Sequence, residues 1–191
     1  MNHKKTKLLL SAGLLLGTLL FAGCGNSLDD QFPFGKNRIH CDNETITIST
    51  PFELVSNGKQ VDLGARDVSK VNAEGHNAHL QILVTGNRVS DDVNETKLTS
   101  EAEEVLKKDS AISNLKSSKK SFTSGDIKGT ELVFTLTESS KGRKTDLTVQ
   151  EYIFTQKNTV WRVIYQYRSS DETGRALADR VAGKIALGSE F

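Results

Sequence analysis

The stretch that decides the fold is Val160-Trp161-Arg162-Val163-Ile164-Tyr165-Gln166-Tyr167-Arg168. Trp161, Tyr165 and Tyr167 are an even number of residues apart, so in an extended strand they share one face. We expect this aromatic row to be core packed under a helix. If the other face is the covered one, the three aromatics form an exposed binding surface. They are therefore the candidate binding residues.

The neighbouring segments predict an antiparallel meander. Residues 147–155 predict a second long strand, and Gln156-Lys157-Asn158-Thr159 separates it from 160–168. The two-residue connection Lys157-Asn158 suits a tight hairpin because Asn tolerates positive φ. An earlier strand follows Gly129, with Leu132, Phe134 and Leu136 alternating with other residues.

Two helices flank this meander. Ser100-Glu101-Ala102-Glu103 fits a capping box, and the apolar residues of 98–106 fall on one helical face. Ser169-Ser170-Asp171-Glu172 fits another and predicts a helix over 171–187. Its buried face would carry Leu177, Val181 and Ile185, which follow one another at intervals of four.

The first part of the domain adds strands. Thr45-Ile46-Thr47-Ile48 alternates and ends near Pro51, and residues 79–85 place Leu80, Ile82 and Val84 on one face. The order of elements predicts the α+β class, an antiparallel β-sheet flanked by helices.

The N-terminus has the layout of a secretory signal peptide. Lys4, Lys5 and Lys7 precede an apolar run over residues 8–22. A helix that crosses the hydrocarbon core needs about 20 residues, so this run is short for a permanent span.

The run ends in Leu20-Phe21-Ala22-Gly23-Cys24, which resembles the lipobox of bacterial lipoproteins. The resemblance implies a diacylglyceryl group on Cys24 and cleavage just before it, although Phe21 departs from the usual aliphatic residue. An ordinary signal peptide with a chance cysteine is the alternative. We predict a signal peptide over 1–23, a lipidated Cys and flexible tether over 24–42, and one domain over 43–191.

The hydrophobic pattern from about residue 44 to 189 resembles the PsbP-like fold. The resemblance rests on Thr47-Ile48-Ser49-Thr50-Pro51, the strand after Gly129, the aromatic after the 156–159 turn and the final amphipathic helix. It implies an α/β/α sandwich, and the family's members are mostly non-enzymatic binding or assembly proteins.

The composition excludes some functions. The net charge is +1 and there are two cysteines. A near-neutral balance gives no support to nucleic-acid binding. With Cys24 acylated, Cys41 is the one remaining thiol, so no intramolecular disulfide can form.

Candidate chemistry is sparse. His76 and His79 are spaced for a metal only if they lie on a helical turn, and the segment instead enters a strand. Cys41 beside His40 would be an exposed thiol next to the tether, without a third catalytic member. A basic cluster of Lys107, Lys108, Lys116, Lys119 and Lys120 is either a solvated face or a docking patch for an anionic partner. We therefore expect no catalytic residues, metal or cofactor.

These observations predict a monomeric, membrane-anchored, non-enzymatic envelope lipoprotein, a binding or assembly module for an unidentified partner. Two alternatives stay open: an envelope enzyme whose site the sequence does not reveal, and an immunity- or inhibitor-type lipoprotein that sequesters a protein partner. In a two-membrane host the lipoprotein resemblance implies the outer membrane, because Gly25 rather than Asp follows Cys24.

Overall fold

The computed structural model describes residues 27–56, 69–88 and 95–188. Two predicted features, the signal peptide over 1–23 and the lipidated Cys24, lie outside these ranges. Within these ranges the chain is mostly antiparallel β-sheet with few helices, and the predicted antiparallel sheet is confirmed.

Seven strands form the main sheet, in the order β3-β4-β5-β9-β8-β7-β6. These strands are β3 (Val55–Ser56), β4 (Ser69–His76), β5 (Gln81–Arg88), β6 (Ile112–Ser124), β7 (Ile127–Ser140), β8 (Arg143–Gln156) and β9 (Thr159–Arg168). A smaller sheet has the order β1-β2-β10. It consists of β1 (Gly35–Cys41), β2 (Glu44–Thr50) and β10 (Ile185–Leu187).

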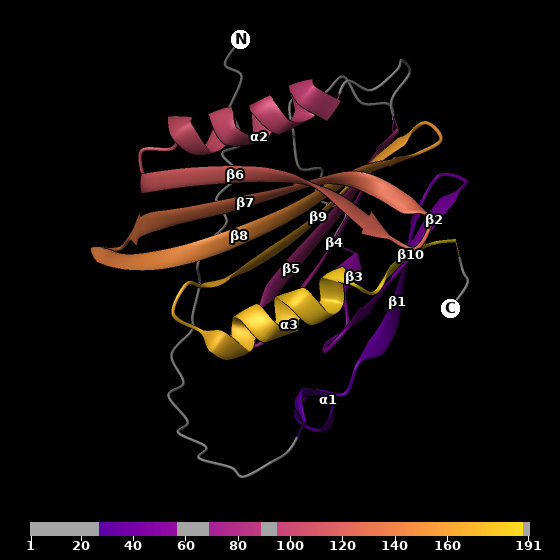
Figure 1. Cartoon of the computed structure of the whole chain (residues 1–191), viewed down its shortest axis with the longest axis horizontal. Coiled ribbons are helices and arrows are strands. Elements are labelled where there is room, and N and C mark those ends of the chain that lie inside the picture. The colour runs from indigo at the N-terminus through magenta and orange to yellow at the C-terminus, as the bar shows by residue number, and fades with distance from the viewer. Residues whose placement is uncertain (1–26, 57–68, 89–94, 189–191) are drawn as a thin grey trace.

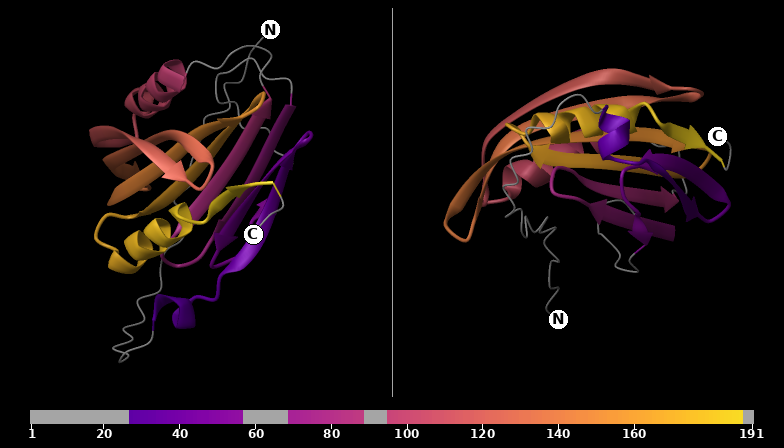
Figure 2. Two further views of the ribbon diagram at one scale, coloured as in Figure 1. Left: turned by 45° about the vertical axis from the view of Figure 1, so that its right-hand side comes forward. Right: turned by 90° about the horizontal axis from the view of Figure 1, so that it is seen from below.

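The helices are α1 (Leu28–Gln31), α2 (Glu95–Lys108) and α3 (Glu172–Ala182). Helix α2 lies on one side of the main sheet, and α3 lies on the other side together with the small sheet (Figures 1 and 2). We call these two sides the α2 face and the α3 face. Every strand pair is antiparallel.

The hairpin between β8 and β9 confirms the predicted meander, with one difference. The turn residue with positive φ is Lys157, at 48°, and not Asn158. The two-residue turn sets the register so that Phe154 lies opposite Trp161. Both side chains therefore point to the α3 face, because paired residues of antiparallel strands share a face.

Helix α3 begins where its sequence predicts but ends early. The Asp171 side chain accepts a hydrogen bond from the backbone N–H of Gly174 and caps the first turn. The helix ends at Ala182, so the predicted helix over 171–187 is wrong at its C-terminal end. Ile185 is buried as expected, yet it belongs to β10 and pairs with Ile48. Backbone bonding to β2 replaces the last helical turn here.

Helix α2 begins at Glu95, five residues before the predicted cap at Ser100. Ser100 is thus inside the helix. Leu98 packs on the sheet from the preceding turn. Because most helical stability in proteins comes from such packing, the polar capping pattern did not set the start.

The predicted tether over 24–42 is wrong for its second half. Residues 35–41 form β1, which pairs along its whole length with β2, and Ile39 is buried. Helix α1 also packs back on the domain, since Arg180 Nη2 lies 2.5 Å from Asp29 Oδ2. Several polar residues of β1, such as Lys36, Arg38 and His40, alternate with more buried ones in an edge strand, and a polar composition of this kind is easily taken for a linker.

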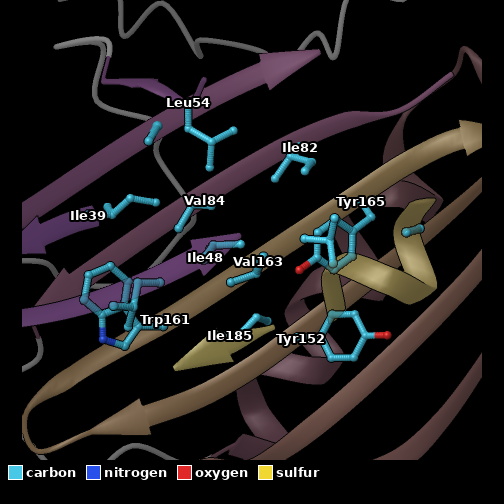
Figure 3. Close-up of a cluster of buried hydrophobic side chains, with 14 of the residues drawn as sticks. Ile39, Ile48, Leu54, Ile82, Val84, Tyr152, Trp161, Val163, Tyr165 and Ile185 are labelled. Carbon is cyan, nitrogen blue, oxygen red and sulfur yellow. The ribbon is translucent and has the colours of Figure 1, made fainter. Parts of the chain in front are cut away.

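The α3 face is filled by aromatic and aliphatic side chains (Figure 3). Trp161 and Tyr165 are fully buried and Tyr167 is almost so. The aromatic row therefore belongs to the core, as expected from the sequence. The alternative, in which Trp161, Tyr165 and Tyr167 form an exposed binding surface, is wrong. Gly86 makes room for the indole, because a Cβ there would lie 2.6 Å from Trp161 Cζ3.

The α2 face has a second, aliphatic core. It contains Leu83, Ala102, Leu132, Phe134, Leu136, Leu147, Val149, Ile153, Val160 and Ile164. Side chains from α2 and from the start of β6 pack against it. The sheet therefore carries an apolar layer on each side.

Candidate functional site

The two histidines singled out from the sequence are separate groups. His76 is exposed at the end of β4, whereas His79 Nδ1 lies 2.9 Å from Asp171 Oδ2. Asp171 also caps α3, so His79 joins a structural contact. Across the described ranges, no three His, Cys, Asp or Glu side chains gather in a way that could hold a metal ion.

Cys41 is buried in β1, and its prediction as an exposed thiol is wrong. Burial, followed by the charge of Asp42, raises the pKa of this thiol. His40 points to the other side of the strand, where Nδ1 lies 2.9 Å from Thr45 Oγ1. The adjacent pair is thus divided between two faces, because successive strand residues alternate.

The basic cluster is largely ion-paired. The pairs are Lys107–Glu103 at 2.7 Å, Lys108–Glu104 at 2.9 Å and Lys120–Glu131 at 3.0 Å. Lys119 Nζ donates to Thr99 Oγ1 at 3.4 Å. These contacts favour the solvated face over the docking patch, because the neighbouring acids cancel most of the positive charge.

A groove on the α2 face is the best candidate site. It runs between α2 and strands β7, β8 and β9, with a cavity of about 100 Å³. Its apolar wall comes chiefly from Ala102, Leu106, Phe134, Leu136, Val149 and Ile164. Val105 stands beside them on α2 and is half exposed. An apolar lining with a few polar groups is usual for a small-molecule site, although the enclosed volume here is smaller than the roughly 300–1,000 Å³ of such pockets.

The register of the sheet gives the groove its length. Glu138 lines one end, and Glu151, which pairs with Leu132 across β7 and β8, lines the other. Glu138 and Leu132 are six residues apart on β7, which corresponds to roughly 20 Å of strand. The groove is therefore elongated along the strands.

A buried ion pair lies at the end of the groove opposite Glu138. Arg162 Nε donates to Glu151 Oε1, and the two side chains are only 8% and 4% exposed. The residues come from neighbouring strands and both point to the α2 face. Taking two charges out of water is costly, so such a pair in an apolar layer contributes little net stability. It does place fixed polar atoms at this end of the groove.

The other end of the groove carries the acidic side chain of Glu138. Glu138 is partly buried, and this burial, followed by the charge of Asp109, raises the pKa of its carboxyl. Asp109 lies just after α2, where its backbone carbonyl accepts from Ile112. A negative charge on Glu138 is thus partly desolvated and is repelled by the charge of Asp109.

Sequence reasoning did not identify this groove. The available signal was charge inside buried strands: Glu151 and Arg162 stand in two runs that otherwise consist mostly of apolar residues, Thr and Gln. Such a pattern also fits a solvated strand face, and only the position of α2 shows that the pair is covered.

None of the helices in the described ranges combines the length and apolar character needed to cross a membrane.

Comparison with known proteins gives a likeness in fold. No family model and no curated protein matches the chain. LpqN, involved in cell envelope biogenesis of Mycobacterium tuberculosis, is 12% identical with a TM-score of 0.50, over 86% of this chain and 99% of that chain. PA94, a Pseudomonas aeruginosa protein of unknown function, is 11% identical with a TM-score of 0.39, over 77% of this chain and 91% of that chain. By its fold, this chain is similar to LpqN over almost the whole length of that protein.

Proposed function

We propose that the protein is a lipid-anchored, non-enzymatic envelope protein that binds an apolar group in the groove under α2. The lipobox-like Leu20-Phe21-Ala22-Gly23-Cys24 supports the anchor. The fold likeness to LpqN, a protein of cell envelope biogenesis, supports the compartment. The sheet with α2 and α3 on opposite sides supports assigning the domain to the PsbP-like α/β/α sandwich.

The main support for a binding function is the groove under α2. Its lining is mostly apolar, and the end opposite Glu138 holds the buried Arg162–Glu151 pair. The α3 face, in contrast, has its aromatic side chains packed into the core. The groove therefore offers apolar surface to a ligand at no cost to the main core.

A non-enzymatic role is supported by the state of the reactive side chains. The imidazole of His79 contacts Asp171, and the thiol of Cys41 is buried with a raised pKa. A general base or nucleophile must be within reach of a substrate. We further propose that the protein is a monomer that works without metal, cofactor or nucleic acid.

Membrane fractionation of a Cys24→Ser variant tests the anchor. We expect the variant to leave the membrane fraction while keeping the thermal melt of the wild type, because the lipid supplies the attachment. Wild-type levels of membrane association in the variant would contradict the lipid anchor.

Binding of the neutral dye N-phenyl-1-naphthylamine tests the groove. Ala102→Phe adds a ring inside it, and Val55→Phe adds the same ring on exposed β3 as the matched control. We expect the dye's fluorescence to rise with the wild type and Val55→Phe and to stay low with Ala102→Phe. Equal binding by all three proteins would remove the groove from the proposal.

A further inference from the structure

We infer that the ligand of the groove is a cationic amphiphile, with an apolar chain under α2 and a primary ammonium group at Glu138. This inference rests on the proposed function and specifies its ligand. It follows from the shape of the groove and from the charges along it.

The shape favours a chain. The lining extends from Glu138 at one end to the Glu151–Arg162 pair at the other. Leu136, Phe134 and Val149 lie between them on adjacent strands. A single side chain from a protein partner would contact only part of this elongated lining, whereas an extended alkyl chain could contact its whole length.

The charges favour a cation. The lining contains three carboxylates, Glu101, Glu138 and Glu151, and one cation, Arg162. Arg162 is bound to Glu151, and Lys97 lies 3.9 Å from Glu101. Within the described part of the chain, no Lys, Arg or His forms an ion pair with Glu138, and the nearby charge is Asp109.

An ammonium group at this end would pair with the Glu138 carboxylate. It would remove the repulsion between Glu138 and Asp109, which an anionic headgroup would increase. At short range and partial burial, opposite charges attract far more strongly than in bulk water. The apolar chain supplies affinity and the ammonium supplies selectivity.

Three probes with the same alkyl chain test the inference: dodecylammonium, dodecanol and dodecanoate, each below its micelle concentration. Displacement of N-phenyl-1-naphthylamine is measured on the full chain with Cys24→Ser in every arm, so that no lipid on the protein competes. We expect dodecylammonium to bind about tenfold more tightly than dodecanoate.

Glu138→Gln should remove that preference and weaken dodecanol binding far less than dodecylammonium binding, because dodecanol carries no charge. Glu104→Gln, an exposed acid of α2 outside the groove, is the matched control and should keep the preference. Thermal melts check that each variant is folded.

The outcomes separate the inference from the proposed function. If Ala102→Phe abolishes binding but the three probes bind equally, or dodecanoate binds best, the cationic headgroup is wrong and the apolar groove stands. A preference for dodecylammonium that persists in Glu138→Gln also overturns the inference. If no probe binds, or binding survives Ala102→Phe, both proposals fail.

Discussion

The two faces of the main sheet use the same strands for different purposes. On the α3 face, α3 and the small sheet close over the fully buried Trp161 and Tyr165 (Figure 3), and Phe154 is also fully buried in this core. On the α2 face, one amphipathic helix covers an aliphatic layer with a buried ion pair and leaves a groove. The difference comes from the cover, because a second sheet plus a helix encloses more surface than one helix can.

This comparison separates stability from binding. A filled core loses contacts when any side chain is shortened, since close-packed interiors hold few voids. A layer that already borders a groove has fewer contacts to lose. We therefore expect the α3 face to determine stability and the α2 face to tolerate change.

A matched pair of isoleucines should show the largest effect. Ile82 is fully buried on the α3 face, and Ile164 lines the groove on the α2 face. Ile82→Ala should lower the free energy of unfolding by about 4 kcal/mol and Ile164→Ala by about 2 kcal/mol, because the second site adds less new cavity. Urea denaturation measures both, and equal losses would contradict the contrast between the faces.

The ion pair should show the next effect. Glu151→Gln leaves Arg162 charged and buried without its carboxylate, so we expect a loss of about 3 kcal/mol. The double variant Glu151→Leu/Arg162→Met removes both charges and should recover most of that loss. Chemical denaturation of the single and double variants checks this. A double variant as unstable as the single one would show that the pair itself stabilises the fold.

Val105→Ser should have a much smaller effect. Val105 is 50% exposed on α2, so its substitution should change the free energy of unfolding by less than about 0.5 kcal/mol. The same change at Val181, which is fully buried on α3, should cost several times more. Thermal melts of the two variants provide the comparison.

Glu138 should give the smallest effect and a distinct pH dependence. Its raised pKa means that the folded state disfavours the ionised carboxyl. The contribution of Glu138 to stability therefore falls as the pH rises from 4.5, the ordinary pKa of a Glu carboxyl, through the higher pKa of the folded state. Glu138→Gln should be slightly more stable than the wild type at pH 7, and the advantage should disappear below about pH 4.5. Melts at pH 4 and pH 7 test the sign, and an advantage at acid pH only would contradict it.

Much of the fold was predictable from local patterns. The β8–β9 hairpin, the apolar face of 79–85 and the buried Leu177 and Val181 all follow the spacing of apolar residues. The edge strands were missed because their outward positions are polar: Lys119 and the neighbouring serines of β6, and much of β1. Polar composition has the same appearance in a solvated strand and in a loop.

The sequence by itself determined the features that local chemistry sets: the antiparallel meander, the start of the last helix, and the charged N-terminus and apolar run that precede Cys24. Only the tertiary structure decided which face of each strand is covered, and by what. Burial depends on partners distant in the chain, as when β10 pairs with β2 instead of extending α3. For the same reason Glu151 and Arg162, whose pairing the sequence did not predict, become the buried pair of the groove, while the aromatic row becomes core.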